Sequence, residues 1–92
     1  MKFIRTPQFR EDYINLSESE KKDVNEAFSL VSEALQGNSV YYRKFRIKKM
    51  EGHPLIWEGH IKINLVFTFQ YENDKGKCIF RRIGTHDIYK KP

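Results

Sequence analysis

The sequence predicts a single α+β domain over residues 1–92, in which two N-terminal helices pack on a mainly antiparallel, twisted sheet. Three observations support this prediction. Residues 6–37 carry helix start signals and a stripe of apolar residues with helical spacing. From residue 41 on, apolar and polar residues alternate with the period of two that is typical of strands. No repeat, low-complexity segment or linker separates the two parts, so they share one core.

The N-terminal segment predicts a short strand at residues 2–5, followed at once by a helix. Thr6 is a favoured residue for a helix N-cap, and Pro7 suits the first helical position, where its missing N–H costs little. The apolar side of this first helix is expected to consist of Phe9, Tyr13 and Leu16.

A second helix start follows in Ser17-Glu18-Ser19-Glu20, which has the spacing of a capping box. Gly37-Asn38 is a favoured helix end. The apolar residues between them recur at helical spacing and form one stripe: Val24, Ala27, Phe28, Val31 and Leu35. This stripe would face the sheet.

The rest of the chain predicts four strands, at residues 41–50, 55–63, 64–71 and 77–84, with a turn at 73–76. In the second of these, Leu55, Trp57, Ile61 and Ile63 share the apolar face. In the third, Leu65, Phe67, Phe69 and Tyr71 do the same.

The opposite face of the sheet gathers polar side chains that could act on RNA. These are Arg46, Lys48, Glu58, His60 and Lys62, and His86 arrives from the end of the last strand. RNA cleavage needs a base for the 2′-hydroxyl proton, an acid for the departing 5′-oxygen and cations around the phosphate. Glu58 and His60 lie two apart on one strand, so both can approach one substrate. The alternative is a set of solvated surface charges.

Composition narrows the class of protein further. The net charge is +5, with 17 Lys and Arg against 12 Asp and Glu, which favours an anionic partner such as nucleic acid. A single cysteine, Cys78, favours a reducing compartment. The sequence has no signal peptide and no transmembrane segment, so a cytoplasmic protein without membrane contact is expected. The three histidines match no common zinc spacing, and no metal or other cofactor is expected.

The order of these elements resembles the RelE/ParE family of bacterial toxins. The resemblance covers nearly the whole chain and includes a basic strand, a Trp-Glu strand, an aromatic strand and an ending of the form R-x-G-x-H-D. Its most specific stretches are Leu55-Ile56-Trp57-Glu58, Phe67-Thr68-Phe69 and Arg82-Ile83-Gly84-Thr85-His86-Asp87-Ile88-Tyr89. Gly84-Thr85-His86, His53-Pro54-Leu55 and His60-Ile61 are similar to the YafQ branch of that family.

The resemblance implies the toxin of a type II toxin–antitoxin system, a metal-independent endoribonuclease that cleaves ribosome-bound mRNA and is paired with an antitoxin protein. By position, His86 would be the general acid and His60 the proton-transfer residue, with Glu58 as a third catalytic candidate. The residues that the resemblance places in RNA binding are Arg46, Lys48, Lys49, His53 and Tyr89.

Two positions depart from the family pattern. Many relatives carry an arginine where this chain has Val66, and YafQ-like toxins carry an aspartate where it has Asn64. Arg81 or Arg82 could supply the missing charge, and Arg82 is included among the RNA-binding candidates.

Two rival functions remain open at the level of sequence. One is a ParE-like toxin that inhibits DNA gyrase by binding, and the other is a non-catalytic RNA-binding relative. The ending Gly84-Thr85-His86 favours cleavage, because ParE-type toxins usually lack a histidine-rich ending.

Overall fold

The computed structural model describes residues 1–72 and 76–92, so most of the turn predicted at 73–76 lies outside the described residues. Five strands form one sheet in the order β1-β5-β4-β3-β2. They are β1 (Lys2–Arg5), β2 (Lys48–Lys49), β3 (Trp57–Lys62), β4 (Leu65–Glu72) and β5 (Lys77–Gly84). β1 runs parallel to β5, and the other pairs are antiparallel. The predicted α+β class is confirmed.

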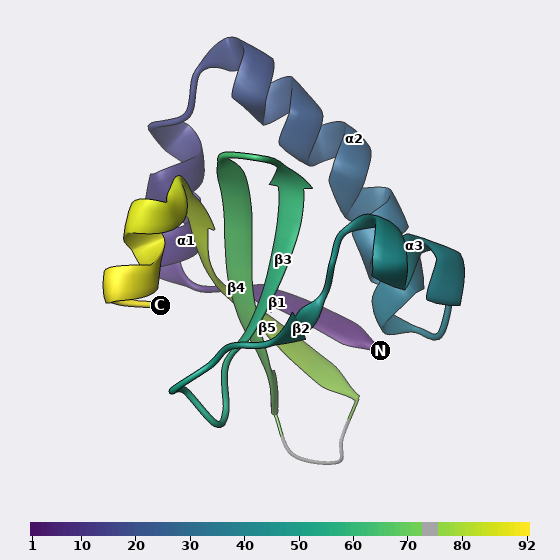
Figure 1. The fold of residues 1–92 in the computed structure, drawn as a ribbon. Coiled ribbons are helices and arrows are strands. Elements are labelled where there is room, and N and C mark those ends of the chain that lie inside the picture. The colour runs from purple at the N-terminus through teal and green to yellow at the C-terminus, as the bar shows by residue number, and fades with distance from the viewer. Residues whose placement is uncertain (73–75) are drawn as a thin grey trace.

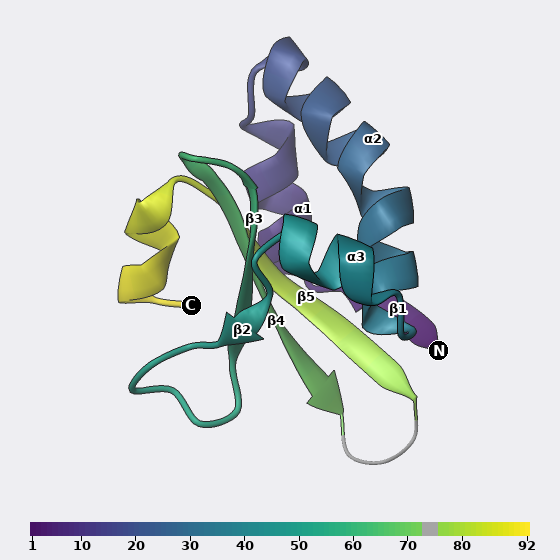
Figure 2. The same cartoon turned by 45° about the vertical axis from the view of Figure 1, so that its right-hand side comes forward.

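The helices cover one face of this sheet. They are α1 (Pro7–Ile14), α2 (Glu18–Leu35) and the short α3 (Ser39–Lys44). The 3-10 helix η1 (His86–Lys90) lies on the opposite face, as the chain turns back after β5 (Figure 1, Figure 2). None of the described helices combines the length and hydrophobicity needed to cross a bilayer.

Both predicted helix starts are confirmed. The Thr6 hydroxyl accepts a hydrogen bond of 3.0 Å from the backbone N–H of Phe9, with Pro7 at the first helical position. At α2, the Ser17 hydroxyl accepts from the Glu20 N–H at 3.1 Å, and the Glu20 carboxylate accepts from the Ser17 N–H at 2.9 Å. These bonds satisfy N–H groups that a helix start leaves without partners.

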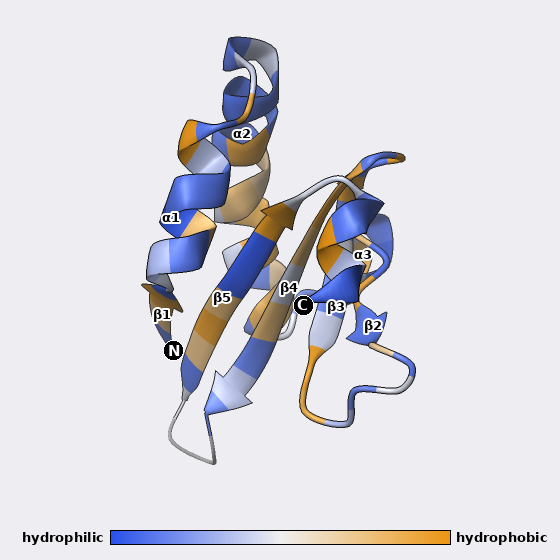
Figure 3. Cartoon of the chain, turned by 90° about the vertical axis from the view of Figure 1, so that its left-hand side faces the viewer, coloured by the Kyte–Doolittle hydropathy of each residue, from blue (hydrophilic) through white to orange (hydrophobic). Residues whose placement is uncertain are grey.

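The core lies between α2 and the helix-facing side chains of β4 and β5. Phe67 and Phe69 of β4 are both 0% exposed. Gly59 of β3 lies directly over Phe67, since a Cβ atom there would be 2.3 Å from the ring. A glycine is therefore required where β3 crosses this ring, and its neighbours Glu58 and His60 point to the other face. Figure 3 shows hydrophobic and hydrophilic stretches alternating along β5.

The strand predicted at residues 41–50 is wrong for most of its length. Residues 39–44 form α3, because the Asn38 side chain caps it by accepting from the N–H groups of Val40 and Tyr41, each at 3.1 Å. Basic residues in the last turn favour this helix through its dipole. Arg46 then adopts a positive φ of 51°, which ends the helix, and only Lys48–Lys49 pair as a strand.

The strand predicted at residues 55–63 is shorter and contains an irregularity. Leu55 is 74% exposed and Ile63 is 89% exposed, so neither belongs to the core. The register shifts between His60 and Lys62, which turns the Lys62 side chain toward α2. There its Nζ lies 2.6 Å from the Asp23 carboxylate. Lys62 therefore does not lie with Glu58 and His60 on the face away from the helices, where the sequence predicted it.

Candidate functional site

Four side chains from β3 and η1 meet on the face away from the helices. The ring centroids of His60 and His86 are 5.8 Å apart. Tyr89 packs nearly perpendicular to His86 at 5.3 Å, and its hydroxyl donates to Glu58 Oε1 at 3.2 Å. We call these four residues the histidine cluster. The structure brings together the three predicted catalytic candidates and one of the predicted RNA-binding residues.

His86 does not lie at a strand end, as the sequence predicted, but at the start of η1. β5 ends at Gly84, and Thr85 turns the chain by capping η1, where its hydroxyl accepts from the Asp87 N–H at 3.3 Å. The exposed His86 ring is held by a contact of 3.1 Å between its Nδ1 and Asn64 Oδ1. Sequence reasoning noted Asn64 only as a departure from a family pattern and missed this contact.

His60 is partly buried and has an unusual environment. Its Nδ1 is inaccessible and has no hydrogen-bond partner among residues 1–72 and 76–92. Burial lowers the pKa of His60 below its ordinary value of 6.5, and the positive charges of Arg46, His86 and Lys48 lower it further, against an opposing effect of Glu58. His60 is therefore neutral at pH 7 and suited to accept a proton.

Glu58 is buried, at 7% exposure, although the strand pattern predicted an open polar face. The reason is that η1 folds back and places Tyr89 over it. Burial and the neighbouring Glu58 carboxylate raise the pKa of Tyr89 above its ordinary value, so the phenol stays protonated and can donate its hydrogen.

The predicted basic residues lie beside the cluster. Lys48 is opposite Glu58 in the β2–β3 register, and the Lys49 Nζ is 5.9 Å from the centroid of the Trp57 ring. A depression of about 440 Å³ opens next to them. It is lined by Lys48, Lys49, Met50, Glu51, His53, Glu58 and Tyr89. Two further predicted residues, His53 and Tyr89, thus share one hollow with the two lysines.

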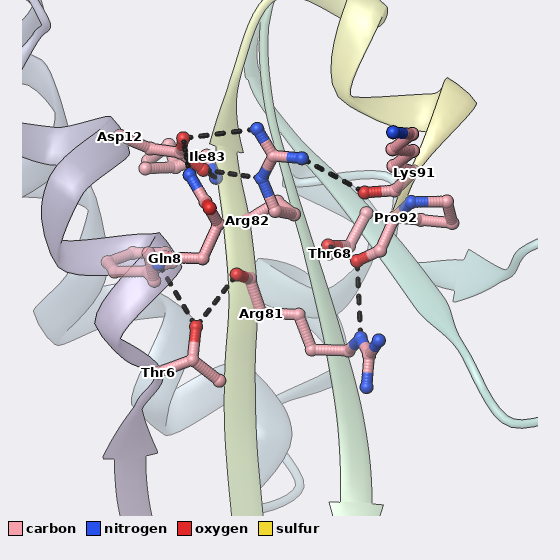
Figure 4. A network of polar contacts seen from close by, with 10 residues as sticks. Thr6, Gln8, Asp12, Thr68, Arg81, Arg82, Ile83, Lys91 and Pro92 are labelled. Carbon is pink, nitrogen blue, oxygen red and sulfur yellow. Dashed lines mark hydrogen bonds and ion pairs between the residues drawn. The ribbon is translucent and has the colours of Figure 1, made fainter.

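Arg82 is not brought into the histidine cluster. Its Nε donates to an Asp12 carboxylate oxygen of α1 at 2.7 Å, and its Nη1 donates to the backbone oxygen of Lys91 at 3.0 Å (Figure 4). Arg81 donates to the Gln70 side chain and, at 3.2 Å, to the backbone oxygen of Pro92. Both arginines hold the C-terminal segment to the sheet.

Val66 occupies the position on β4 at which the sequence resemblance led us to expect an arginine, and no cation from elsewhere takes that place among the described residues. Val66 is 0% exposed, because η1 covers this part of the sheet, where Ile88 is also buried. The described residues contain no group of three or more side chains that could hold a metal ion.

The fold was compared with solved structures. YafQ from E. coli strain BL21(DE3) superimposes with a TM-score of 0.70 over 96% of both chains, at 15% sequence identity. This chain has the fold of the RelE/ParE toxins. A YoeB/ParE toxin from Agrobacterium tumefaciens also gives a TM-score of 0.70, at 15% identity, over 94% of this chain and 99% of that chain.

A third likeness comes from the RelB–RelE antitoxin–toxin complex of Methanococcus jannaschii, with a TM-score of 0.67 and 19% identity over 96% of this chain and 95% of that chain. No family model and no curated protein matches the sequence. The resemblance inferred from the sequence is therefore confirmed for the fold.

Proposed function

We propose that this protein is the toxin of a type II toxin–antitoxin system and that it cleaves ribosome-bound mRNA in the cytoplasm without a metal ion or other cofactor. The observation that supports this most is the pair His60 and His86, 5.8 Å apart on the open face of a RelE/ParE-like fold. Two imidazoles at this separation can serve the two proton transfers that RNA cleavage needs.

In the proposed reaction, neutral His60 takes the proton of a ribose 2′-hydroxyl. The 2′-oxygen attacks the adjacent phosphorus, and the bond from phosphorus to the 5′-oxygen breaks. Protonated His86 gives its proton to that oxygen. The products are a 2′,3′-cyclic phosphate and a 5′-hydroxyl end. The lowered pKa of His60 suits the base, and the exposed position of His86 suits an acid that must reach the leaving group.

The proposed RNA-binding surface consists of Arg46, Lys48, Lys49, His53 and Tyr89. The first three are exposed cations next to the cluster, and cations there stabilise the charge that develops on the phosphate. Arg82 is left out of this surface, because its guanidinium already pairs with Asp12. Glu58 remains a weaker candidate for proton transfer, because Tyr89 occupies one of its oxygens.

The experiment that tests this function is inducible expression followed by mapping of mRNA 5′ ends. His86→Gln should slow cleavage roughly 100- to 10,000-fold, the range typical of general acid catalysis, with RNA binding and melting temperature little changed. His60→Ala should give a similar loss. His53→Gln changes a histidine of the proposed binding surface instead, so it should weaken RNA binding and slow cleavage far less than His86→Gln. A His86→Gln protein that folds and still cleaves would overturn the catalytic assignment.

An antitoxin partner is the second part of the proposal. Two solved relatives with this fold are complexes, DinJ–YafQ and RelB–RelE. An acidic or amphipathic segment of the partner would cover Arg46, Lys48 and the His86 end through charge complementarity. Co-purification with the product of the neighbouring gene should be lost after charge reversal at Arg46 and Lys48. An unaffected complex would show that the partner binds elsewhere.

A ParE-like gyrase inhibitor is the alternative function. It is favoured by the equal TM-score to the YoeB/ParE toxin and by Val66 at the arginine position. Expression would then arrest growth and reduce DNA supercoiling without new mRNA 5′ ends, and His86→Gln would leave the arrest intact.

A further inference from the structure

We propose that the depression between the β2–β3 connection and η1 is a nucleobase subsite, in which the Glu58 carboxylate selects bases that carry an exocyclic amino group. This inference rests on the proposed function, because it assigns a place to one nucleotide of the RNA beside the histidine cluster.

The depression has the size and composition for one nucleotide. Its volume of about 440 Å³ lies near the lower end of the range for small-ligand sites, roughly 300–1,000 Å³. Glu58 lies at its base and is 7% exposed, whereas Lys48, Lys49 and Glu51 at its rim are exposed. The Tyr89 ring lines the same hollow. It offers an aromatic surface next to a charged floor.

Glu58 has an acceptor position that no side chain fills. Its Oε1 accepts from the Tyr89 hydroxyl, and no donor among residues 1–72 and 76–92 reaches its Oε2. Oε2 is accessible to solvent, since among these residues His60 Nδ1 is the one buried side-chain atom without a partner. An ionised carboxylate can only accept hydrogen bonds, so a base that displaces water from Oε2 must offer an N–H group in its place.

The charges decide which part of a nucleotide enters. A phosphate would be repelled by Glu58 but attracted by Lys48 and Lys49 at the rim, so the base enters and its phosphate stays outside. Guanine offers two adjacent N–H donors, and adenine and cytosine each offer an amino group. Uracil places carbonyl oxygens on both sides of its single N–H, and these are repelled by a carboxylate.

The bound base would lie next to the reacting bond. His86 packs against Tyr89 at 5.3 Å, and Tyr89 is part of the wall of the hollow. A base held there belongs to a nucleotide adjacent to the cut, so its selection would appear as a sequence preference at one fixed position.

The test is a titration of the purified protein with guanosine and uridine 3′-monophosphates, followed by NMR. These ligands carry the same phosphate and differ in the base. Wild type should bind the guanosine compound about 10-fold or more tightly than the uridine compound, in line with the discrimination of a good base contact. Glu58→Gln should abolish most of this difference, because the amide still accepts from Tyr89 and now also donates to a uracil oxygen. Its melting temperature should stay close to that of wild type.

Glu33→Gln is the matched control, since it removes the same charge from an exposed position on α2. It should leave the preference unchanged. Equal binding of the two nucleotides to wild type, or no binding of either, would overturn the inference whether or not the protein cleaves RNA. Selective binding without cleavage would instead overturn the proposed function and leave the subsite standing. In cleavage maps, an equal loss of cleavage at all sites in Glu58→Gln would overturn base selection by Glu58 and favour a role in proton transfer.

Discussion

The two faces of the sheet are built from alternate residues of the same strands, yet they are held by different forces. On the helix face, Phe67 and Phe69 are fully buried among apolar side chains. On the other face, Thr68 is equally buried, but its hydroxyl donates to the backbone oxygen of Pro92 at 3.0 Å. Apolar burial dominates the first face, whereas the second combines buried apolar residues under η1, such as Val66, with hydrogen bonds to the C-terminal segment.

This difference separates stability from chemistry between the two faces of the sheet. On the helix face a side chain can be removed only by leaving a cavity. On the other face His86 is exposed and His60 is only partly buried, so a substrate can reach both histidines. Substitutions on the two faces are therefore expected to change different measurements.

The largest effect is expected from Phe67→Ala. Removing a fully buried aromatic ring should lower the free energy of unfolding by about 3–5 kcal/mol, through lost transfer energy and the cavity left behind. Urea unfolding would measure this, with Phe67→Leu as the volume-related control and a smaller loss. Cleavage per folded molecule should hardly change. A loss of activity in the folded fraction would mean that the two faces are coupled.

A smaller effect, and one that depends on pH, is expected from Asp12→Asn. Burial raises the pKa of Asp12, but hydrogen bonds from Arg82, Gln8 and the Ile83 N–H outweigh burial and hold it below its ordinary value of 3.8. The ionised form therefore stabilises the fold above that value, and this contribution falls as pH falls through the lower pKa of the folded state.

At pH 7 the Asp12→Asn protein should be less stable by about 1.5–3 kcal/mol, the range for hydrogen bonds to charged groups. The difference from wild type should shrink as pH is lowered below 4 in denaturant titrations. A difference that is constant with pH would show that the charge of Asp12 is unimportant.

Lys48→Ala should change binding without changing stability. Losing one phosphate contact should weaken RNA binding and reduce the slope of log affinity against log salt by about one unit. Ser17→Ala is the opposite control, because it removes the α2 cap and should cost about 1 kcal/mol of stability with RNA binding unchanged. If Ser17→Ala abolished binding and Lys48→Ala did not, the polar face would be the wrong surface.

The smallest effect is expected from Arg46→Ala on the pH profile of cleavage. Activity should fall on the acid side as His60 becomes protonated, at a pH below 6.5 because its pKa is lowered. Arg46 contributes to that lowering, so its removal should raise the pKa and move the acid limb to higher pH. Arg43→Ala, on α3 and outside the groups that act on His60, should leave the limb in place. A shift to lower pH would contradict the assignment of His60 as base.

The sequence predicted the elements that have strong local signals. The caps at Thr6 and Ser17 and the stripe of α2 are confirmed, and Leu65, Phe67 and Phe69 of β4 lie in the core as predicted. Each of these features is set by neighbouring residues. The prediction of a strand at residues 41–50 was wrong because a local signal was again decisive. Its alternation of apolar and basic residues is compatible with a strand, but the Asn38 cap favours a short helix ahead of it.

The site was predictable only in part, because its geometry comes from contacts distant in sequence. Alternation placed Glu58 and His60 on one face, as observed. It could not show that η1 returns to bury Glu58, nor that the register shift after His60 would send Lys62 to Asp23. The contact of His86 with Asn64 joins residues 22 apart along the chain, and only the position of a turn near the end of β5 could have suggested it.

The parallel pairing of β1 with β5 also governs when the sheet can close during synthesis of the chain. β1 cannot pair until residues 77–80 of β5, its partners in the sheet, have been synthesised, and α1 packs against β5 as well. At roughly 5–20 residues per second, several seconds separate the synthesis of the two partners. The histidine cluster needs η1, which is made later still. The fold and the histidine cluster can therefore be complete only after residues 77–90 have been synthesised, and until then β1 has no partner strand.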